Sequence, residues 1–145
     1  MPRLHLVAIA GSLTASLAAC DATYEDVSSD GMYRPLIGAL CTIQRPLNAY
    51  GVTMKLERQK KTDFVVLSAL NLSGPEFTFS SVLPAGTKLQ VLSARRCTNC
   101  PFEIRIDYHV TVKPEPPQFA GKPVYLAAEP TRSGHVVCEA RNGAA

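Results

Sequence analysis

The chain has 145 residues, of which 46% are hydrophobic and 19% are charged, and its formal net charge is +3. This length fits one domain of ordinary size, and this composition excludes an intrinsically disordered chain. So weak a positive charge is not a nucleic-acid signature, so we expect no nucleic acid among the partners. Eleven prolines and nine glycines favour short elements joined by turns over long helices.

The chain begins with the segment MPRLHLVAIAGSLTASLAAC, in which Arg3 is the only formally charged residue. The apolar part of this segment is too short and too interrupted for a membrane-spanning helix, which needs about 20 predominantly apolar residues. A basic start, an apolar middle and small residues before a cleavage point are typical of a secretory signal. We therefore predict that residues 1–19 form a signal helix that is removed by cleavage.

The four residues that end this segment, Leu17-Ala18-Ala19-Cys20, resemble the lipobox of bacterial lipoprotein precursors. The resemblance implies that Cys20 carries a diacylglycerol, that cleavage occurs just before it, and that a further fatty acid such as palmitate acylates the new N-terminus. Two or more acyl chains anchor a protein stably without spanning the bilayer. The implied location is the bacterial cell envelope, lipid-anchored and facing the periplasm. Asp21 resembles the inner-membrane retention signal of enteric bacteria. The alternative is an ordinary cleaved signal, with Cys20 kept as a disulfide partner.

Residues 20–34 contain four acidic residues, one arginine and few apolar residues. This composition predicts a solvated acidic tether, whose charge would not draw it to anionic lipid. The rest of the chain, residues 35–145, is predicted to be a single β domain.

Strand signals dominate the predicted domain. The clearest is Phe102–Val112, which alternates apolar and polar residues throughout and indicates a strand with one solvated face. Leu83–Gly86 predicts a turn, because proline and glycine occupy positions that turns favour, and residues 77–83 are predicted to pair with residues 87–94 across it as a hairpin. The prolines among residues 113–123 predict an irregular loop, because proline cannot donate a hydrogen bond to a strand ladder. The remaining candidates are 38–43, 50–56, 63–70, 77–83, 87–94, 124–128 and 135–140; for 63–70 a buried strand and a helical turn both stay open.

Six to eight short strands separated by turns predict an all-β fold, a small antiparallel barrel or sandwich. The segment VLPAGTKLQVL, Val82–Leu92, is similar to the part of bacterial SH3-like domains in which a Pro-Gly turn leads into a barrel strand. This resemblance implies an SH3-like or similar barrel.

If Cys20 is acylated, four cysteines remain, and an even number in an exported domain predicts disulfides, with three possible pairings. Thr98 and Asn99 lie between two strand patterns and are predicted to form the tip of a two-residue hairpin turn. Cys97 would then bond to Cys100 across the turn, and Cys41 would bond to Cys138.

Two other interpretations of these cysteines stay open. Cys97 and Cys100 have the spacing of a thiol-disulfide redox site, although such sites lie at a helix N-terminus, and a strand pattern follows here. Cys97, Cys100, His135 and Cys138 have the composition of a structural zinc site, which needs four ligands converging tetrahedrally.

One polar face of the long strand pattern carries Arg105, Asp107 and His109, with Asp107 placed to hold His109. These residues are a candidate ligand face or a weak hydrolase site, but an ordinary polar sheet face is the simpler interpretation, because no activated nucleophile is recognisable. The sequence therefore predicts a non-catalytic binding or structural module rather than an enzyme. We expect no cofactor apart from the zinc alternative, and an envelope protein or a toxin as partner, the latter by fold-level analogy.

Overall fold

The computed structural model describes residues 22–56, 60–100 and 105–139. In chain order its elements are β1 (Tyr24–Asp26), η1 (Arg34–Leu36), β2 (Leu40–Ile43), β3 (Leu47–Val52), β4 (Phe64–Ser68), β5 (Phe77–Leu83), β6 (Lys88–Cys97), β7 (Ile106–Lys113), η2 (Pro117–Phe119), β8 (Val124–Ala127), α1 (Glu129–Arg132) and β9 (Val136–Glu139). Both η elements are 3-10 helices. The mostly β fold expected from the sequence is confirmed.

The strands of the described residues form one nine-stranded sheet in the order β5-β3-β4-β8-β7-β6-β2-β9, with β1 paired to β6. The sheet is mixed rather than purely antiparallel as predicted, because β4 and β8 run parallel. It also has more strands than the six to eight expected, and β1 is one that the sequence did not suggest. Residues 113–123 allow the parallel pairing, because they carry the chain back so that β8 lies between β7 and β4.

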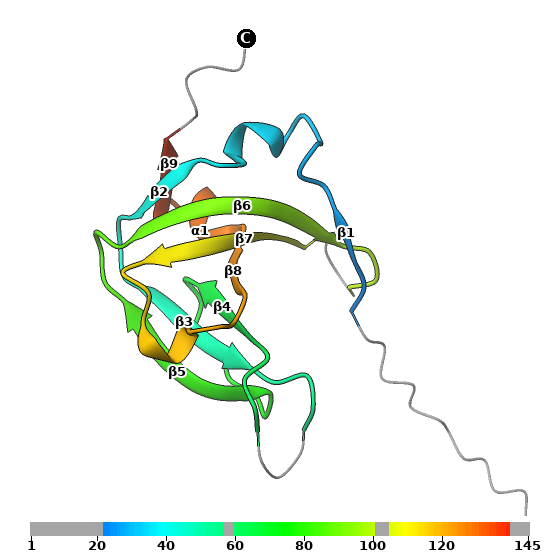
Figure 1. Cartoon of the computed structure of the whole chain (residues 1–145), viewed down its shortest axis with the longest axis vertical. Coiled ribbons are helices and arrows are strands. Elements are labelled where there is room, and N and C mark those ends of the chain that lie inside the picture. Colours follow the sequence, from blue (N-terminus) through cyan, green and yellow to red (C-terminus); the bar gives the residue numbers. More distant parts are fainter. Residues whose placement is uncertain (1–21, 57–59, 101–104, 140–145) are drawn as a thin grey trace, which may run out of the picture.

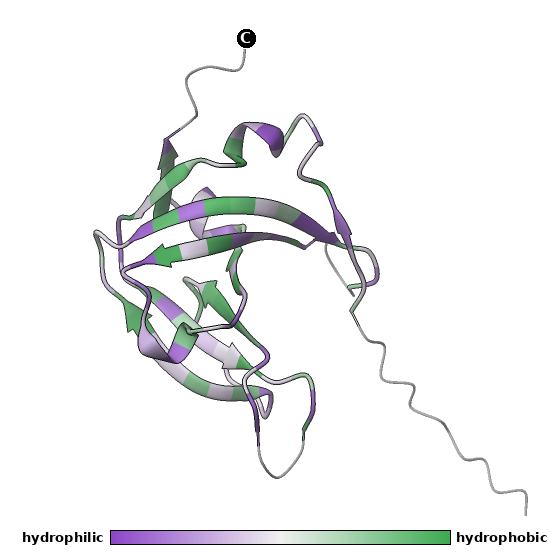
Figure 2. Cartoon of the chain, viewed as in Figure 1, coloured by the Kyte–Doolittle hydropathy of each residue, from purple (hydrophilic) through white to green (hydrophobic). Residues whose placement is uncertain are grey.

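The sheet is strongly curled, and the hydrophobic core lies inside the curl. Figure 1 shows β6 and β7 arching over β3 and β5. Core residues come from both of these layers, including Leu89 and Val91 in β6 and Leu47 and Ala49 in β3. Phe119 of η2 is fully buried in the same core. Figure 2 shows the alternation of hydrophobic and hydrophilic residues along β6 that places one face of the strand in this core.

The hydropathy patterns of β7 and β4 in the sequence match the strand faces that the structure buries. In β7, Tyr108, Val110 and Val112 point into the core, as the alternation predicted. The first residues of the predicted Phe102–Val112 strand, up to Ile104, lie outside the described residues. The apolar run at 63–70, which left strand and helix open, contains strand β4, and Val65–Ser68 are all buried. A strand buried on both faces reads as a continuous apolar run, and a parallel neighbour is typical of such strands.

Residues 22–34 are part of the fold, so the expected solvated tether does not hold for them. Tyr24–Asp26 pairs with β6, and Val27 is buried in the core. Tyr33 packs edge-on against Tyr108, with ring centroids 6.4 Å apart. The acidic residues misled the prediction because an edge strand can keep them in solvent. Glu25, for example, pairs with Arg96 across the ladder at 2.6 Å.

Candidate functional site

The two predicted disulfides are present. Cys41 of β2 lies directly opposite Cys138 of β9, with their Cα atoms 3.9 Å apart. Cys97, the last residue of β6, is bonded to Cys100, with a Cα–Cα distance of 5.7 Å. The first disulfide therefore joins an early strand to the last strand, and the second closes a short loop at the end of β6.

The loop closed by Cys97 and Cys100 is not the two-residue hairpin tip that was predicted. The β6–β7 ladder ends where the Cys97 N–H donates to the Arg105 carbonyl at 2.9 Å, so the connection is longer than Thr98-Asn99. These two residues extend the pairing with the N-terminal segment instead. The Thr98 N–H donates to the Thr23 carbonyl at 2.9 Å, and the Thr23 N–H donates to Oδ1 of Asn99 at 2.7 Å. The disulfide thus closes the loop whose residues hydrogen-bond to Thr23, the residue just before β1.

The structure does not bring the four zinc candidates together. Cys41 and Leu89 are partners in the β2–β6 ladder, and Cys97 lies eight residues further along β6. At the usual strand rise this is roughly 25 Å from the Cys41–Cys138 bond. No group of three or more metal-ligating side chains occurs within the described residues. For the redox interpretation, Cys97 ends a strand instead of lying at a helix N-terminus, the position that lowers a thiolate pKa.

Two of the three residues of the candidate ligand face, Arg105 and Asp107, belong to an ion network centred on the buried Asp107 carboxylate. The Asp107 side chain is 0% exposed; it accepts a hydrogen bond from Nη2 of Arg95 at 3.3 Å and from Nε of Arg105 at 3.1 Å. The Arg95 guanidinium lies between the rings of Tyr24 and Tyr125, at 3.9 and 3.5 Å from their centroids. A cation between two aromatic faces is held by the ring quadrupoles. This arrangement connects β1, β6, β7 and β8.

His109 is not held by Asp107 as predicted. Its ring packs on Tyr125, with the centroids 5.4 Å apart. Burial lowers the pKa of His109 below its ordinary value of 6.5, and the nearby positive charge of Arg95 lowers it further. The histidine is therefore neutral at physiological pH. The carboxylate that would orient a catalytic histidine is engaged by two arginines, so this face has a structural explanation.

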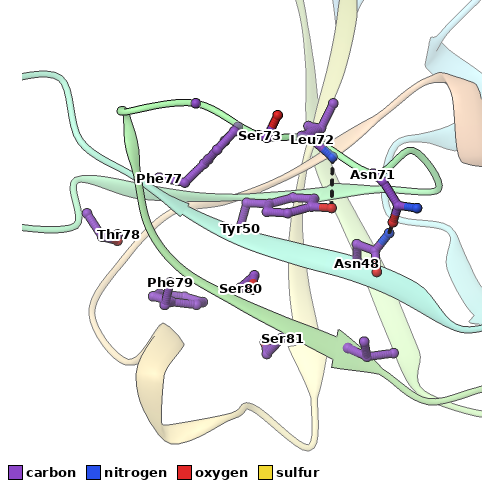
Figure 3. A pocket seen from close by; sticks show the side chains of 12 residues that line it. Asn48, Tyr50, Asn71, Leu72, Ser73, Phe77, Thr78, Phe79, Ser80 and Ser81 are labelled. Atoms are coloured by element: carbon purple, nitrogen blue, oxygen red, sulfur yellow. Dashed lines mark hydrogen bonds between the residues drawn. The ribbon is translucent and has the colours of Figure 1, made fainter.

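A groove lies on the outer face of β3 and β5, where the sequence predicted no site. It has a volume of about 610 Å³, and Figure 3 shows Tyr50 on its floor between Phe77 and Asn48. We call it the β5 trough. It is lined by Asn48, Tyr50, Asn71, Leu72, Ser73, Gly74, Phe77, Thr78, Phe79, Ser80, Ser81 and Val82.

The rim of the β5 trough is fixed by hydrogen bonds to β3. The Tyr50 hydroxyl donates to the Leu70 carbonyl at 3.1 Å. It also accepts a hydrogen bond from the Leu72 N–H at 3.0 Å, which Figure 3 shows. Nδ2 of Asn48 donates to Oδ1 of Asn71 at 3.1 Å. Tyr50 also packs against Phe77, with centroids 5.0 Å apart. The trough is therefore a formed groove and not a gap between mobile side chains.

A second, smaller groove adjoins β5. It has a volume of about 330 Å³ and lies between the end of β5 and the proline-rich loop before η2. Ser81 and Val82 line both grooves, so both lie beside this part of β5. The lining residues of this second groove are Ser81, Val82, Leu83, Pro84, Thr87, Pro114, Glu115, Pro116, Pro117 and Gln118.

The lining of the β5 trough is made of aromatic, apolar and uncharged polar side chains. It offers aromatic rings, hydroxyls and amides, and none of its side chains is charged at neutral pH. The sequence did predict strand Phe77–Leu83, but not that loop 70–74 folds back over β3 to make a groove beside it.

Comparison with protein families, curated proteins and solved structures finds no match for this chain. Among the described residues, no helix is both long enough and apolar enough to cross a membrane.

Proposed function

We propose that this chain is a lipid-anchored protein of the bacterial cell envelope, whose β domain is a non-catalytic binding module. The observation that carries the proposal is the cysteine pairing. Four of the five cysteines are consumed by two disulfides, so Cys20 has no cysteine of its own chain left to bond. A cysteine left over in this way, at the end of an apolar segment with a lipobox sequence, fits an acylation site.

The disulfides also support an oxidising compartment such as the periplasm. Stable disulfides are rare in the cytosol of most organisms, and the Cys41–Cys138 bond sits in the core, where Cys41 is 1% exposed. The curled sheet with Phe119 in its interior supports the small-barrel class over two separate stacked sheets. The binding surface in this proposal is the β5 trough.

A lipid on Cys20 would hold the domain close to the membrane. Strand β1 begins at Tyr24, and the four-residue step from Cys20 spans at most about 14 Å when fully extended. The end of the fold that contains β1 and the Cys97–Cys100 loop would then face the bilayer.

The proposal is tested by labelling. Bacteria expressing the full chain are fed an alkyne-tagged palmitate, and the protein is isolated from the membrane and soluble fractions. We expect label on the wild type and on Cys97→Ser/Cys100→Ser, and none on Cys20→Ser, which should leave the membrane fraction. Label that persists on Cys20→Ser would contradict the proposal.

A further inference from the structure

Strand β5 is a free edge of the sheet. It ends the strand order and pairs only with β3. Within the described residues, no backbone hydrogen bond joins Thr78–Val82 to any segment other than β3, with which they form the ladder. The backbone donors and acceptors on its outer side are therefore available to a further strand, because alternate residues of an edge strand point their N–H and C=O groups outward.

This edge lacks the usual protections against pairing. Natural edge strands are kept short, charged or interrupted by proline. At the other end of the sheet, β9 has four residues, including Glu139. By contrast, β5 has seven residues, FTFSSVL, without a charged residue or a proline. Val82 is 60% exposed on it. An edge strand without these protections can pair with another strand, so we infer that β5 of this exported domain has a binding partner.

The two grooves beside this edge together reach every residue of β5. Seven residues of β5 span roughly 23 Å at the usual strand rise, and Phe77–Val82 line one groove while Ser81–Leu83 line the other. The loop on the far side of the second groove contains Pro114, Pro116 and Pro117, which have no N–H to donate. The loop therefore lines the groove, but its prolines donate no hydrogen bond to the outward-facing carbonyls of β5.

We propose that β5 binds an extended, uncharged polypeptide segment of another exported protein, which adds to the sheet as a further strand. This inference rests on the proposed function and names the class of its partner. Backbone hydrogen bonds supply affinity in strand addition, and alternate side chains supply specificity. One set of the partner's side chains would lie over Tyr50 and Phe77, and the other would point towards the proline-rich loop.

Two properties favour a single peptide strand over other occupants. The vacant donors and acceptors recur every two residues, a spacing that another polypeptide backbone matches. The β5 trough has no charged lining residue, which favours a segment without charges where it crosses the trough, because a charge desolvated there would have no partner; the second groove carries Glu115.

The test is a selection from a phage-displayed library of random peptides of about ten residues, on the full chain purified from membranes in detergent. Val82→Lys places a charge on the β5 edge, and Val137→Lys, at a valine 50% exposed on β9, is the matched control. We expect enriched peptides to be uncharged and to bind Val82→Lys about tenfold more weakly or worse, with Val137→Lys unchanged. An analogue N-methylated at alternate residues on the pairing edge should lose binding.

Amide hydrogen exchange gives a readout that does not depend on a variant. Binding of the best synthetic peptide should slow exchange in β5 and leave β9 unchanged. No enriched peptide, or binding that leaves the β5 amides unprotected, overturns the proposal, and so does tighter binding of soluble oligosaccharides in the trough. Acylation of Cys20 is measured separately on the same preparation, so failure of the peptide site and failure of the anchor are distinguishable.

Discussion

The two disulfides should contribute very different amounts to stability. Cys41 and Cys138 are 97 residues apart, whereas Cys97 and Cys100 are 3 apart. If disulfides act by restricting the unfolded chain, loops of these lengths correspond to about 5 and about 2 kcal/mol. We therefore expect Cys41→Ala/Cys138→Ala to lose about 3 kcal/mol more than Cys97→Ala/Cys100→Ala. The burial of Cys41 adds a packing loss of the same sign.

The assay is urea unfolding of the chain from Asp21 onward, followed by circular dichroism, with free energies extrapolated to zero urea. Wild type and both double variants are compared without reductant. Wild type in reductant is the control, and its stability should be no higher than that of the Cys41→Ala/Cys138→Ala variant.

Equal losses in the two variants would refute this reasoning. A larger loss in Cys97→Ala/Cys100→Ala would have the same consequence. Either result would mean that the short loop stabilises the protein through its contacts with Thr23 and β1, and not through the length of chain it closes.

Three further outcomes follow from single side chains. Asp107→Asn should cost about 1–3 kcal/mol, because it removes the buried carboxylate that two partly exposed arginines contact. Glu25→Gln should cost at most about 1 kcal/mol at an exposed pair. Urea unfolding measures both losses, and a loss for Asp107→Asn no larger than that for Glu25→Gln would count against the role of this carboxylate. The pKa of His109 in the folded protein is below 6.5, so the unfolded chain binds more protons as the pH falls through 6.5, and the free energy of unfolding decreases there. His109→Gln should make this decrease smaller between pH 7.5 and 5.5. An unaltered pH profile of stability would contradict the conclusion that burial lowers the pKa of His109. Gly51→Ala should lower the free energy of unfolding by about 1–3 kcal/mol, because the Cβ of the new alanine would collide with the Phe79 ring. An unchanged melting temperature would show that the ring moves freely.

The sequence predicted those features that depend on local pattern. The alternation in β7, the Pro84–Gly86 turn before β6 and the pairing of the cysteines follow from residue spacing and residue chemistry. The hairpin predicted across that turn is wrong, because β5 pairs with β3 and not with β6. Gly86 has a φ of 89°, a conformation that glycine adopts at no steric cost. These features could be found because each is encoded within a few residues or by counting cysteines.

The features that the sequence did not predict depend on which strands become neighbours. Nothing in the pattern of β8 says that it pairs with β4, and nothing in the N-terminal segment indicates that Tyr24 covers Arg95. The contact between Arg95 and Asp107 follows only once the β6–β7 register is known. The β5 trough likewise depends on a long-range arrangement, since Tyr50 must hold the loop at Leu70 and Leu72 beside an edge strand.

The central claim, a lipid-anchored and disulfide-bonded domain, is tested most directly by the intact mass of the protein purified from membranes, before and after reduction and alkylation. We predict a chain that begins at Cys20 with added acyl mass. Because each of the two disulfides removes two hydrogens, the unreduced protein should be four hydrogens lighter than the fully reduced chain. An unlipidated chain from the membrane fraction, or free thiols at Cys41, Cys97, Cys100 or Cys138 before reduction, would contradict the claim.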